Sequence, residues 1–381
     1  MPLKILIAPN SFKECSDSVT ISEYLFHDLC KGGNSLILKP VSDGGDGFLK
    51  VCEKNFGLEI INYRVTTPFN DTKINCEVGY DKVNKILFIE SANVLGLKII
   101  PTAQRNPLNL SSKGMGELLS KALTDHRNGK RKIKKIVIGI GGTGINDLGL
   151  GLFAKFGLKI FDRYGKELEV TSSNFVKAEK LNWSKIVLPF DIEIITDVEN
   201  ELLGKNGATL VFGKQKGLTT KGIEAVEKGF QNILHLLKNG KIIKTSKNLS
   251  GAGGGLAAGL QIFFGAKLIQ SKYFILNELG IKKVKNIDFV ITGEGSFDKQ
   301  SLMDKATGSL VKYFSENNIP VIIFCGIYDK QILKHLPQTV EFIELKKYFK
   351  NKKESIKNFR KGILLASKEM QSKIDKQNFI A

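Results

Sequence analysis

Short apolar runs alternate with amphipathic segments from one end of the chain to the other. Runs such as 3–8 and 135–140 have the length of strands rather than helices, and they predict strands that are buried on both faces. Segments with apolar residues three and four positions apart, such as 221–237, predict helices that bury one face. Regular alternation of the two patterns is typical of an α/β protein.

The same pattern distinguishes the two chain ends from the middle. In the ends we expect strands at 3–8, 36–40, 289–292, 321–325 and 340–345, and helices at 20–29, 302–314 and 354–370. Thr20 and Glu23 have the spacing of a capping box for the first of these helices. In the middle, strand-like runs at 60–67, 74–79 and 85–89 are joined by turns, which predicts antiparallel pairing. Beyond them we expect helices at 112–126, 148–156 and 221–237 and strands at 135–140 and 192–196.

This organisation predicts two domains, which suits a chain of 381 residues. Residues 1–61 and 286–381 are expected to form one parallel-sheet domain built from both chain ends. Residues 62–285 are expected to form an inserted α/β domain with a mixed sheet.

The charge is strongly basic, with 57 Lys and Arg against 38 Asp and Glu and a net charge of +19. Nucleic-acid readers rely on arginine and on clustered charge, whereas here only six of the basic residues are arginine and the lysines are dispersed. The composition therefore favours capture of a small anionic substrate over a nucleic-acid partner. A regulator or nucleic-acid binder that uses this charge stays an alternative.

Five cysteines without a C-x-x-C spacing argue against a disulfide framework and against a zinc site. Residues 1–12 lack the apolar stretch of a signal peptide, and the apolar stretch 251–266 is too short and glycine-rich for a membrane span. We therefore expect a cytoplasmic protein without a membrane partner. The oligomeric state stays open, and a homodimer is one option.

Four apolar runs end in acidic residues within short polar or glycine-rich segments. These residues are Asp43 and Asp46, Glu90, Asp197, and Glu294 and Asp298. Because ligands bind at the carboxyl ends of strands in parallel sheets, acids at these places are positioned for a metal or a substrate. Each could instead cap a helix or form a turn. Four strand ends of the same type favour a functional role for at least two of them.

Two glycine clusters are candidates for anion binding. Residues 139–144 read Gly-Ile-Gly-Gly-Thr-Gly after a predicted strand, and Asp162 lies near the distance at which a dinucleotide fold has its ribose-binding acid. This spacing leaves an NAD-dependent dehydrogenase open, although an anion at a helix N-terminus is the safer interpretation. Residues 251–255 open an apolar helix, where bare amides could meet phosphate or where glycine could allow close helix packing.

Three further residues have side chains suited to anionic groups. Ser11 and Lys13 follow the first predicted strand, where a hydroxyl and a point charge could hold an oxyanion. Arg105 precedes a serine-rich helix start and is a candidate carboxylate fork. P-loop, protein-kinase and serine-hydrolase motifs are absent from the sequence.

Taken together, these segments resemble the bacterial glycerate kinases. The similarity runs from end to end in the family's order: KILIAPNSFKECSDS, PVSDGGDGF, IESANVLGL, NPLNLSSKGMGELL, IVIGIGGTGINDLGLGL, ITDVENELLGKNGATLVFGKQKG, GAGGGLAAGL and VITGEGSFDKQSL. Eight ordered blocks are far more specific than a single glycine pattern.

The resemblance implies a flavodoxin-like domain built from both chain ends and an inserted α/β domain. It also implies a phosphotransferase with an alcohol acceptor that uses ATP and Mg²⁺ to convert D-glycerate to 2-phosphoglycerate, with 3-phosphoglycerate as the less favoured product. A kinase for another small hydroxy or sugar acid would share every motif.

On this hypothesis each candidate residue receives a role. The catalytic set is Lys13, Asp43, Asp197 and Asp298, with Asp43 and Asp197 as metal ligands. Substrate binding falls to Ser11, Asp46 and Arg105, and nucleotide binding to Gly141, Gly142, Thr143, Gly144, Gly253, Gly254 and Glu294. The chain departs from the family pattern at Asn10, Lys214 and Ser296, where the family usually has Asp, Pro and Arg. These departures bear on affinity and on acceptor choice.

Overall fold

The computed structural model describes residues 2–197, 200–245, 248–302 and 305–375. Its contacts define two compact units, one of Met1–Phe56 with Gln270–Ala381 and one of Gly57–Ile269. We call them unit 1 and unit 2. The segment 270–285, which the sequence pattern assigned to the inserted domain, groups with unit 1 in this division. The predicted domain limits at 61 and 286 remain a proposal.

Unit 1 is built on a five-stranded sheet with the order β2-β1-β12-β13-β14. Its strands are β1 (Lys4–Ile7), β2 (Ser35–Leu38), β12 (Phe289–Phe297), β13 (Val321–Tyr328) and β14 (Val340–Glu344). Every neighbouring pair is parallel. Numbered within the unit, this is the 2-1-3-4-5 order of flavodoxin-like sheets. The prediction of a parallel sheet contributed by both chain ends is confirmed.

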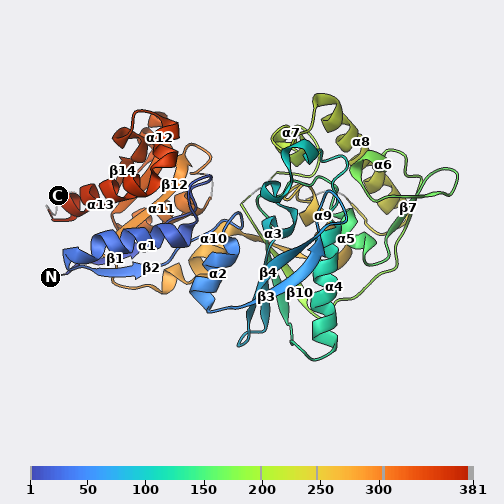
Figure 1. Cartoon of the computed structure of the whole chain (residues 1–381), viewed down its shortest axis with the longest axis horizontal. Coiled ribbons are helices and arrows are strands. Elements are labelled where there is room, and N and C mark those ends of the chain that lie inside the picture. The colour runs from blue at the N-terminus through green and yellow to red at the C-terminus, as the bar shows by residue number, and fades with distance from the viewer. Residues whose placement is uncertain (1, 198–199, 246–247, 303–304, 376–381) are drawn as a thin grey trace. The chain divides into compact units, whose positions relative to one another are not determined.

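Helices cover this sheet and close its core (Figure 1). α1 (Ser18–Leu29) packs against α13 (Phe359–Asp375), while α11 (Ala306–Glu316) packs against β12 and β13. Alternate strand residues such as Ile5 and Ile291 meet the apolar faces of α1 and α13 in one cluster. The loop after β1 is fixed to this core by Phe12, whose ring stacks on Phe324 with a centroid distance of 5.2 Å.

Unit 2 contains a mixed six-stranded sheet with the order β11-β10-β6-β5-β4-β3. Its strands are β3 (Glu59–Thr66), β4 (Lys73–Asp81), β5 (Ile86–Glu90), β6 (Lys135–Gly139), β10 (Asp191–Thr196) and β11 (Lys267–Gln270). β3, β4 and β5 form the predicted antiparallel series, whereas β5, β6 and β10 are parallel. The carboxyl ends of those three parallel strands therefore lie on one edge of the sheet.

The longer helices of unit 2 are α4 (Lys113–Arg127), α8 (Thr220–Asn239) and α9 (Leu256–Phe264). A small antiparallel sheet of β7 (Lys159–Phe161), β8 (Glu167–Leu168) and β9 (Lys180–Asn182) was not predicted, because its strands are too short to show a period. The remaining helices of the described residues are α2 (Phe48–Phe56), α3 (Ala92–Leu95), α5 (Leu150–Ala154), α6 (Ser172–Phe175), α7 (Ala208–Phe212), α10 (Ser271–Tyr273) and α12 (Lys352–Lys357), with short single turns between them.

Several local predictions were wrong in detail. Asp17, not Thr20, caps α1, because its carboxylate accepts the Thr20 amide at 2.9 Å while Glu23 pairs with Lys54. The expected helix 354–370 is two helices, α12 and α13, because the chain turns at Asn358 to bring Phe359 against Phe12. The expected helix 148–156 is only α5, and β12 extends five residues past the predicted strand 289–292.

Candidate functional site

The carboxyl ends of β1 and β12 form the topological switch point of unit 1. Between these adjacent parallel strands the chain order reverses, which is where ligands bind in open α/β sheets. The Asn10 amide donates to the Gly293 carbonyl at 2.9 Å, so the loop after β1 continues alongside β12. A Cβ atom placed on Gly295 would lie 3.6 Å from the Lys13 backbone nitrogen. The structure thus brings the predicted Ser11–Lys13 segment next to the Glu294 segment.

The loop after β1 leaves two polar side chains outside the core. The half-buried Ser11 has its amide bound to the Asn10 side-chain oxygen at 2.8 Å, and Lys13 is exposed. Asn10, at the first of the departures from the family pattern, is 6% exposed. Its side chain therefore shapes the backbone of this loop, which a carboxylate oxygen at the same place could also do.

Glu294 is the most perturbed carboxyl of unit 1. Its Oε1 atom is shielded from solvent and has no hydrogen-bond partner among the described residues. Burial raises the pKa of Glu294 to about 7, although a hydrogen bond from Ser301 acts to lower it. The negative charges of Asp43 and Asp298 add to the rise. The positive charge of Lys305 acts in the opposite direction. A carboxyl group that titrates near neutrality beside other carboxylates is characteristic of functional sites.

Asp43 and Asp46 lie in the Ser-Asp-Gly-Gly-Asp-Gly loop that follows β2. Asp43 accepts the Gly45 amide at 3.1 Å and is half-buried, as is Asp46. Gly44 and Gly47 have φ values of 93° and 87°, which side-chain-bearing residues rarely adopt. Asp43 is therefore both a turn former and a neighbour of Glu294, so the two interpretations of this residue are compatible.

Asp298 has its Oδ1 atom engaged in a turn, where it accepts the amides of Gln300 at 2.8 Å and Ser301 at 3.2 Å. The Ser301 hydroxyl lies 3.1 Å from the Asp298 nitrogen, and Ser301 is only 2% exposed. Ser296, at another departure from the family pattern, is exposed on the same segment. The structure therefore places Glu294, Asp43 and Asp298 together, with Asp298 tied to the local backbone.

In unit 2, a buried carboxylate organises the segment after β6. Asp147 is fully buried and accepts the Ser112 amide at 2.7 Å, the Ser112 hydroxyl at 2.8 Å and the Gly149 amide at 3.1 Å. Burial raises the pKa of the Asp147 carboxyl, while these bonds and one from Gly151 oppose the rise. Asp147 thus joins the start of α4 to the turn that leads into α5 and has a structural role.

The glycine-rich segment 139–144 does not lead directly into a helix, because α5 begins only at Leu150. Its own backbone bonds link it to the neighbouring loop, with the Gly144 amide on the Leu95 carbonyl at 2.7 Å and the Leu97 amide on the Gly142 carbonyl at 3.1 Å. Asp162 bonds the amides of its own turn between β7 and β8. The context of a dinucleotide-binding fingerprint is therefore missing here.

Lys216 is a candidate that the sequence reasoning missed. Its ammonium donates to the Ile145 carbonyl at 2.8 Å and lies 3.4 Å from the Thr143 hydroxyl. Burial lowers the pKa of Lys216 to about 8, against the nearby negative charge of Asp147. The Gly-Lys-Gln-Lys-Gly run around it was a visible signal, but the pattern did not show which lysine turns inward. Lys214, the third departure from the family pattern, is exposed.

The second glycine cluster packs closely against the first. A Cβ atom on Gly254 would lie 2.1 Å from the Ile145 carbonyl, and one on Gly253 would lie 2.8 Å from the Ile140 side chain. Both residues have positive φ. The packing explanation therefore accounts for these glycines, while their contact with nucleotide remains a prediction.

Arg105 directs its guanidinium to backbone carbonyls, with 3.1 Å from Nε to Ile100 and 3.1 Å from Nη2 to Leu97. Its own carbonyl lies so close to Gly217 that a Cβ there would be 2.3 Å away. Arg105 thus joins the loop before α4 to the Lys216–Gly217 turn. Some of the guanidinium N–H groups are therefore bonded within the protein, and the role of Arg105 toward substrate stays a prediction.

Glu90 and Asp197 extend the parallel edge of unit 2. Glu90 ends β5 and is paired in register with Gly139, which pairs in turn with Ile195 of β10, two residues before Asp197. Glu90, the 139–144 segment and Asp197 therefore follow three adjacent strands at one edge. Within the described residues, no group of three or more His, Cys, Asp or Glu side chains has the arrangement of a complete metal cage.

The remaining predictions concern cysteines and membrane spans. All five cysteines are free thiols, and three of them, Cys52, Cys76 and Cys325, are buried. Among the helices of the described residues, none combines the length and apolar character needed to cross a bilayer.

The two units define an α/β protein with polar residues at the carboxyl ends of parallel strands. Residues 5–373 match the glycerate kinase family. Relatives include a glycerate kinase of Neisseria meningitidis serogroup B, 33% identical over 85% of each chain, and a glycerate 2-kinase of Escherichia coli K12, 30% identical over 85% of each chain. A crystal structure from Salmonella typhimurium LT2, provisionally named glycerate kinase 2, matches all of both chains with a TM-score of 0.76 and 25% identity.

The chain belongs to the glycerate kinase family. It is therefore a phosphotransferase with an alcohol group as acceptor, and family membership implies ATP as the phosphoryl donor and glycerate as the acceptor.

Proposed function

We propose that this protein transfers the γ-phosphoryl group of ATP to D-glycerate and that the product is 2-phosphoglycerate. The relative from Escherichia coli that is named a glycerate 2-kinase supports this choice of hydroxyl. The single observation that carries the proposal is the acidic cluster of Glu294, Asp43 and Asp298 at the switch point of the parallel sheet. Phosphoryl transfer needs positioned acids and cations rather than covalent chemistry, and this cluster can supply them.

In unit 1, Lys13 and Ser11 are the proposed anion-binding pair, since both follow β1 beside the Glu294 segment. Asp43 is the proposed orienting group for the glycerate hydroxyl, with Asp46 as a further contact to substrate. Glu294, with a pKa near 7, can hold or release a proton at neutral pH and is well suited to accept the hydroxyl proton. Asp298 is the less favoured base because its Oδ1 atom is engaged by two amides.

The donor set also fits Mg²⁺. Magnesium usually binds one or two carboxylates and completes its shell with water and phosphate oxygens, so a complete protein cage is not required. Asp43 offers a half-buried carboxylate near the partnerless Oε1 atom of Glu294, and Asp197 is the proposed ligand in unit 2. When bound, Mg²⁺ would neutralise negative charge on the phosphate oxygens.

In unit 2, the proposed nucleotide contacts are the amides of Gly141, Gly142 and Thr143, while the Gly144 amide, bonded to the Leu95 carbonyl, holds the segment in place. Gly253 and Gly254 pack against Ile140 and Ile145, the residues that flank this segment. Lys216 bonds the Ile145 carbonyl and lies beside Thr143, so we assign it to the positioning of this segment. Arg105 is proposed to act on the substrate carboxylate with the part of its guanidinium that is not bonded to Leu97 and Ile100.

The test is ADP release from the purified protein with Mg-ATP, with and without D-glycerate, followed by phosphorus NMR of the product. Glycerate-dependent ADP release and a 2-phosphoglycerate signal are expected. A 3-phosphoglycerate signal would overturn the regiochemistry alone. No stimulation by glycerate, together with stimulation by another hydroxy or sugar acid, would overturn the acceptor.

A further inference from the structure

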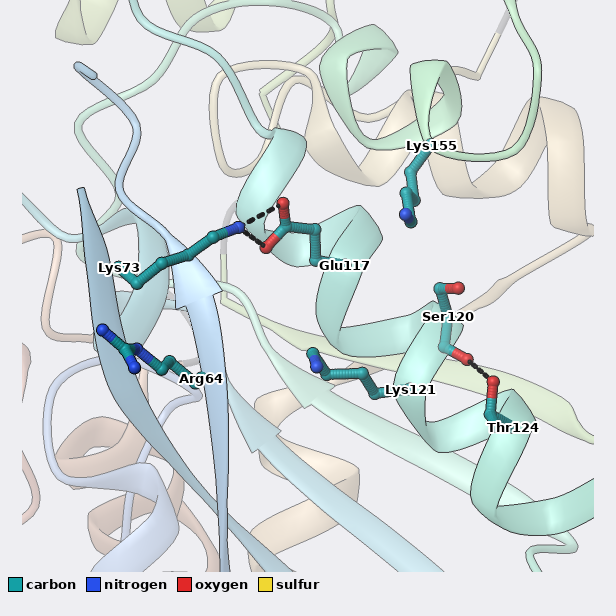
Figure 2. Close-up of a pocket in the computed structure, with 7 residues that line it drawn as sticks. All are labelled: Arg64, Lys73, Glu117, Ser120, Lys121, Thr124 and Lys155. Carbon is teal, nitrogen blue, oxygen red and sulfur yellow. Dashed lines mark hydrogen bonds and ion pairs between the residues drawn. The ribbon is translucent and has the colours of Figure 1, made fainter. Parts of the chain in front are cut away.

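Unit 2 has a basic pocket away from the strand ends described above. Its volume is about 460 Å³, and its lining consists of Arg64, Lys73, Glu117, Ser120, Lys121, Thr124 and Lys155. Figure 2 shows that these side chains come from β3 and β4, from one face of α4 and from the end of α5. The volume is in the range of small-ligand sites. None of these residues is aliphatic or aromatic, so the apolar surface of the pocket comes from the methylene stems of its long side chains, which end in charged groups.

The only carboxylate of the lining is already neutralised. Glu117 accepts two bonds from the Lys73 ammonium at 2.8 Å and two from Thr66, at 2.9 Å from the amide and 2.7 Å from the hydroxyl. Although burial acts in the opposite direction, these bonds hold the pKa of Glu117 below its ordinary value. Glu117 is therefore a charged and fully engaged group.

This arrangement leaves Lys121 without its natural partner. On a helix, Glu followed four residues later by Lys is the favourable orientation for an ion pair, and Glu117 and Lys121 have this spacing. Because Lys73 crosses from β4 and takes both carboxylate oxygens, Lys121 forms no ion pair within the part of the chain that the structure describes. Arg64 and Lys155 likewise form no ion pair with any residue that the structure describes.

Two of these cations, Lys121 and Lys155, extend into the space beside α4, whereas the Arg64 guanidinium is turned away from α4 (Figure 2). Lys155 extends from the end of α5 toward α4, and Lys121 extends from α4 toward the two strands (Figure 2). Ser120 and Thr124 lie one turn apart on α4, and the Thr124 hydroxyl donates to the Ser120 carbonyl at 2.9 Å. Several positive charges with one neutralised carboxylate repel one another, and an anion bound among them would relieve that repulsion.

We propose that this pocket is a binding site for a small anion with several negative charges, of the inorganic diphosphate class. A ligand with charge at both ends can reach ammonium groups on opposite walls at once, which a singly charged anion cannot do. The site shares no residue with those proposed for phosphoryl transfer. The proposal therefore goes beyond the proposed function and does not depend on it.

The test uses inorganic diphosphate as the probe and isothermal titration calorimetry of the full chain at low ionic strength. The test variant is Lys121→Gln with Lys155→Gln. The matched control is Lys177→Gln with Lys180→Gln, which removes the same charge from two exposed lysines of unit 2 outside the pocket. Both pairs lie on the surface, so both variants should fold.

Diphosphate should bind the wild type, and the pocket variant should bind it at least tenfold more weakly while the control binds as the wild type does. Saturation with a non-hydrolysable ATP analogue should leave this binding in place. Equally weakened diphosphate binding in both variants would show that the net charge of the protein, and not the pocket, determines the affinity. Displacement by the ATP analogue would assign the binding to the nucleotide site. Either result would overturn the proposal, as would the absence of binding to the wild type.

Discussion

Asp147 receives the backbone amide of Ser112 at 2.7 Å and the Ser112 hydroxyl at 2.8 Å, across 35 residues of sequence. The hydroxyl also accepts the Leu152 amide at 2.8 Å, so one serine joins the start of α4 to α5. These buried bonds fix the start of α4 and residues 147–152, which follow the glycine-rich segment 139–144. The turn into α5 is therefore held by a carboxylate that itself has no access to solvent.

Asp147→Asn should lower the free energy of unfolding of unit 2 by about 3 kcal/mol, because one acceptor oxygen becomes a donor facing buried amides. Urea denaturation followed by fluorescence measures the loss. Asp162→Asn is the matched control: an asparagine can still accept the two amides of that turn, so a change of less than about 0.5 kcal/mol is expected. Equal losses in the two variants would contradict the special role of Asp147.

Gly254→Ala should cost about 2–4 kcal/mol of stability. Its φ is +70°, and the new Cβ would lie 2.1 Å from the Ile145 carbonyl, so conformational strain and a backbone clash add together. Gly165→Ala has a similar φ of +79° with no atom within 4 Å, and only the conformational cost of about 1–2 kcal/mol is expected. Thermal unfolding of both variants separates the clash from the strain. A similar loss in both would show that the close packing of 253–255 is unimportant.

Asp43→Asn should reduce kcat by about 10²–10⁴ while the thermal midpoint stays near that of the wild type. The reason is that the variant keeps the shape and turn of the loop but loses the charge beside Glu294. Steady-state ADP release measures the effect, with the exposed Glu316→Gln at the end of α11 as a control for charge removal in unit 1. Turnover within a factor of two of the wild type would remove Asp43 from the proposed machinery.

Glu294 should make unit 1 less stable as the pH rises through neutrality. Its pKa is about 7 in the fold against an ordinary value of 4.5, so between these values the folded state binds more protons than the unfolded state. Its stabilising contribution is thus complete below pH 4.5 and is lost as the pH rises through 7. The free energy of unfolding of Glu294→Gln, which mimics the protonated form, should rise relative to that of the wild type by about 2–3 kcal/mol from pH 5 to pH 8. A difference that does not vary with pH would contradict this environment.

Lys216 should have the opposite dependence on pH. Its pKa is about 8 in the fold against 10.5 ordinarily, so between these values the unfolded state binds more protons and stability rises with pH. The stability of the wild type relative to Lys216→Met should therefore increase from pH 8 to pH 10.5. Denaturation at several pH values measures it, and Lys214→Met, at an exposed neighbour, serves as the control. The same pH slope in all three proteins would assign the effect to other groups.

The parallel sheet of unit 1 could be predicted because its strands are buried and strongly apolar. Ile5, Ile291 and Ile322 all face one core, and the local pattern around each already demands a strand. Which strands are neighbours was not visible in the same way, since β1 pairs with β12 across most of the chain. The order of the sheet followed from the family resemblance rather than from periodicity.

The candidate site was predictable only as residue types at strand ends. Asp43 and Glu294 could be selected because they follow apolar strands, where ligands bind in parallel sheets, but their proximity depends on the order of the sheet. Lys216 was missed because an inward-turning lysine among surface lysines has no periodic signal. Arg105 was selected for its charge, yet backbone carbonyls take much of its fork, which only the tertiary structure shows.

The separation of β1 from its partner β12 fixes an order of events during synthesis. Ile5 pairs with Phe289, so β1 can pair with β12 only after 284 further residues have been synthesised. At 5–20 residues per second this synthesis takes about 15–60 s. Unit 2, which ends at Ile269, is complete before β12 has left the ribosome. Unit 2 can therefore fold while the edge of β1 that pairs with β12 is still open, although β2 is already available to its other edge. This interval is when the chain is most exposed to aggregation and has most need of a chaperone.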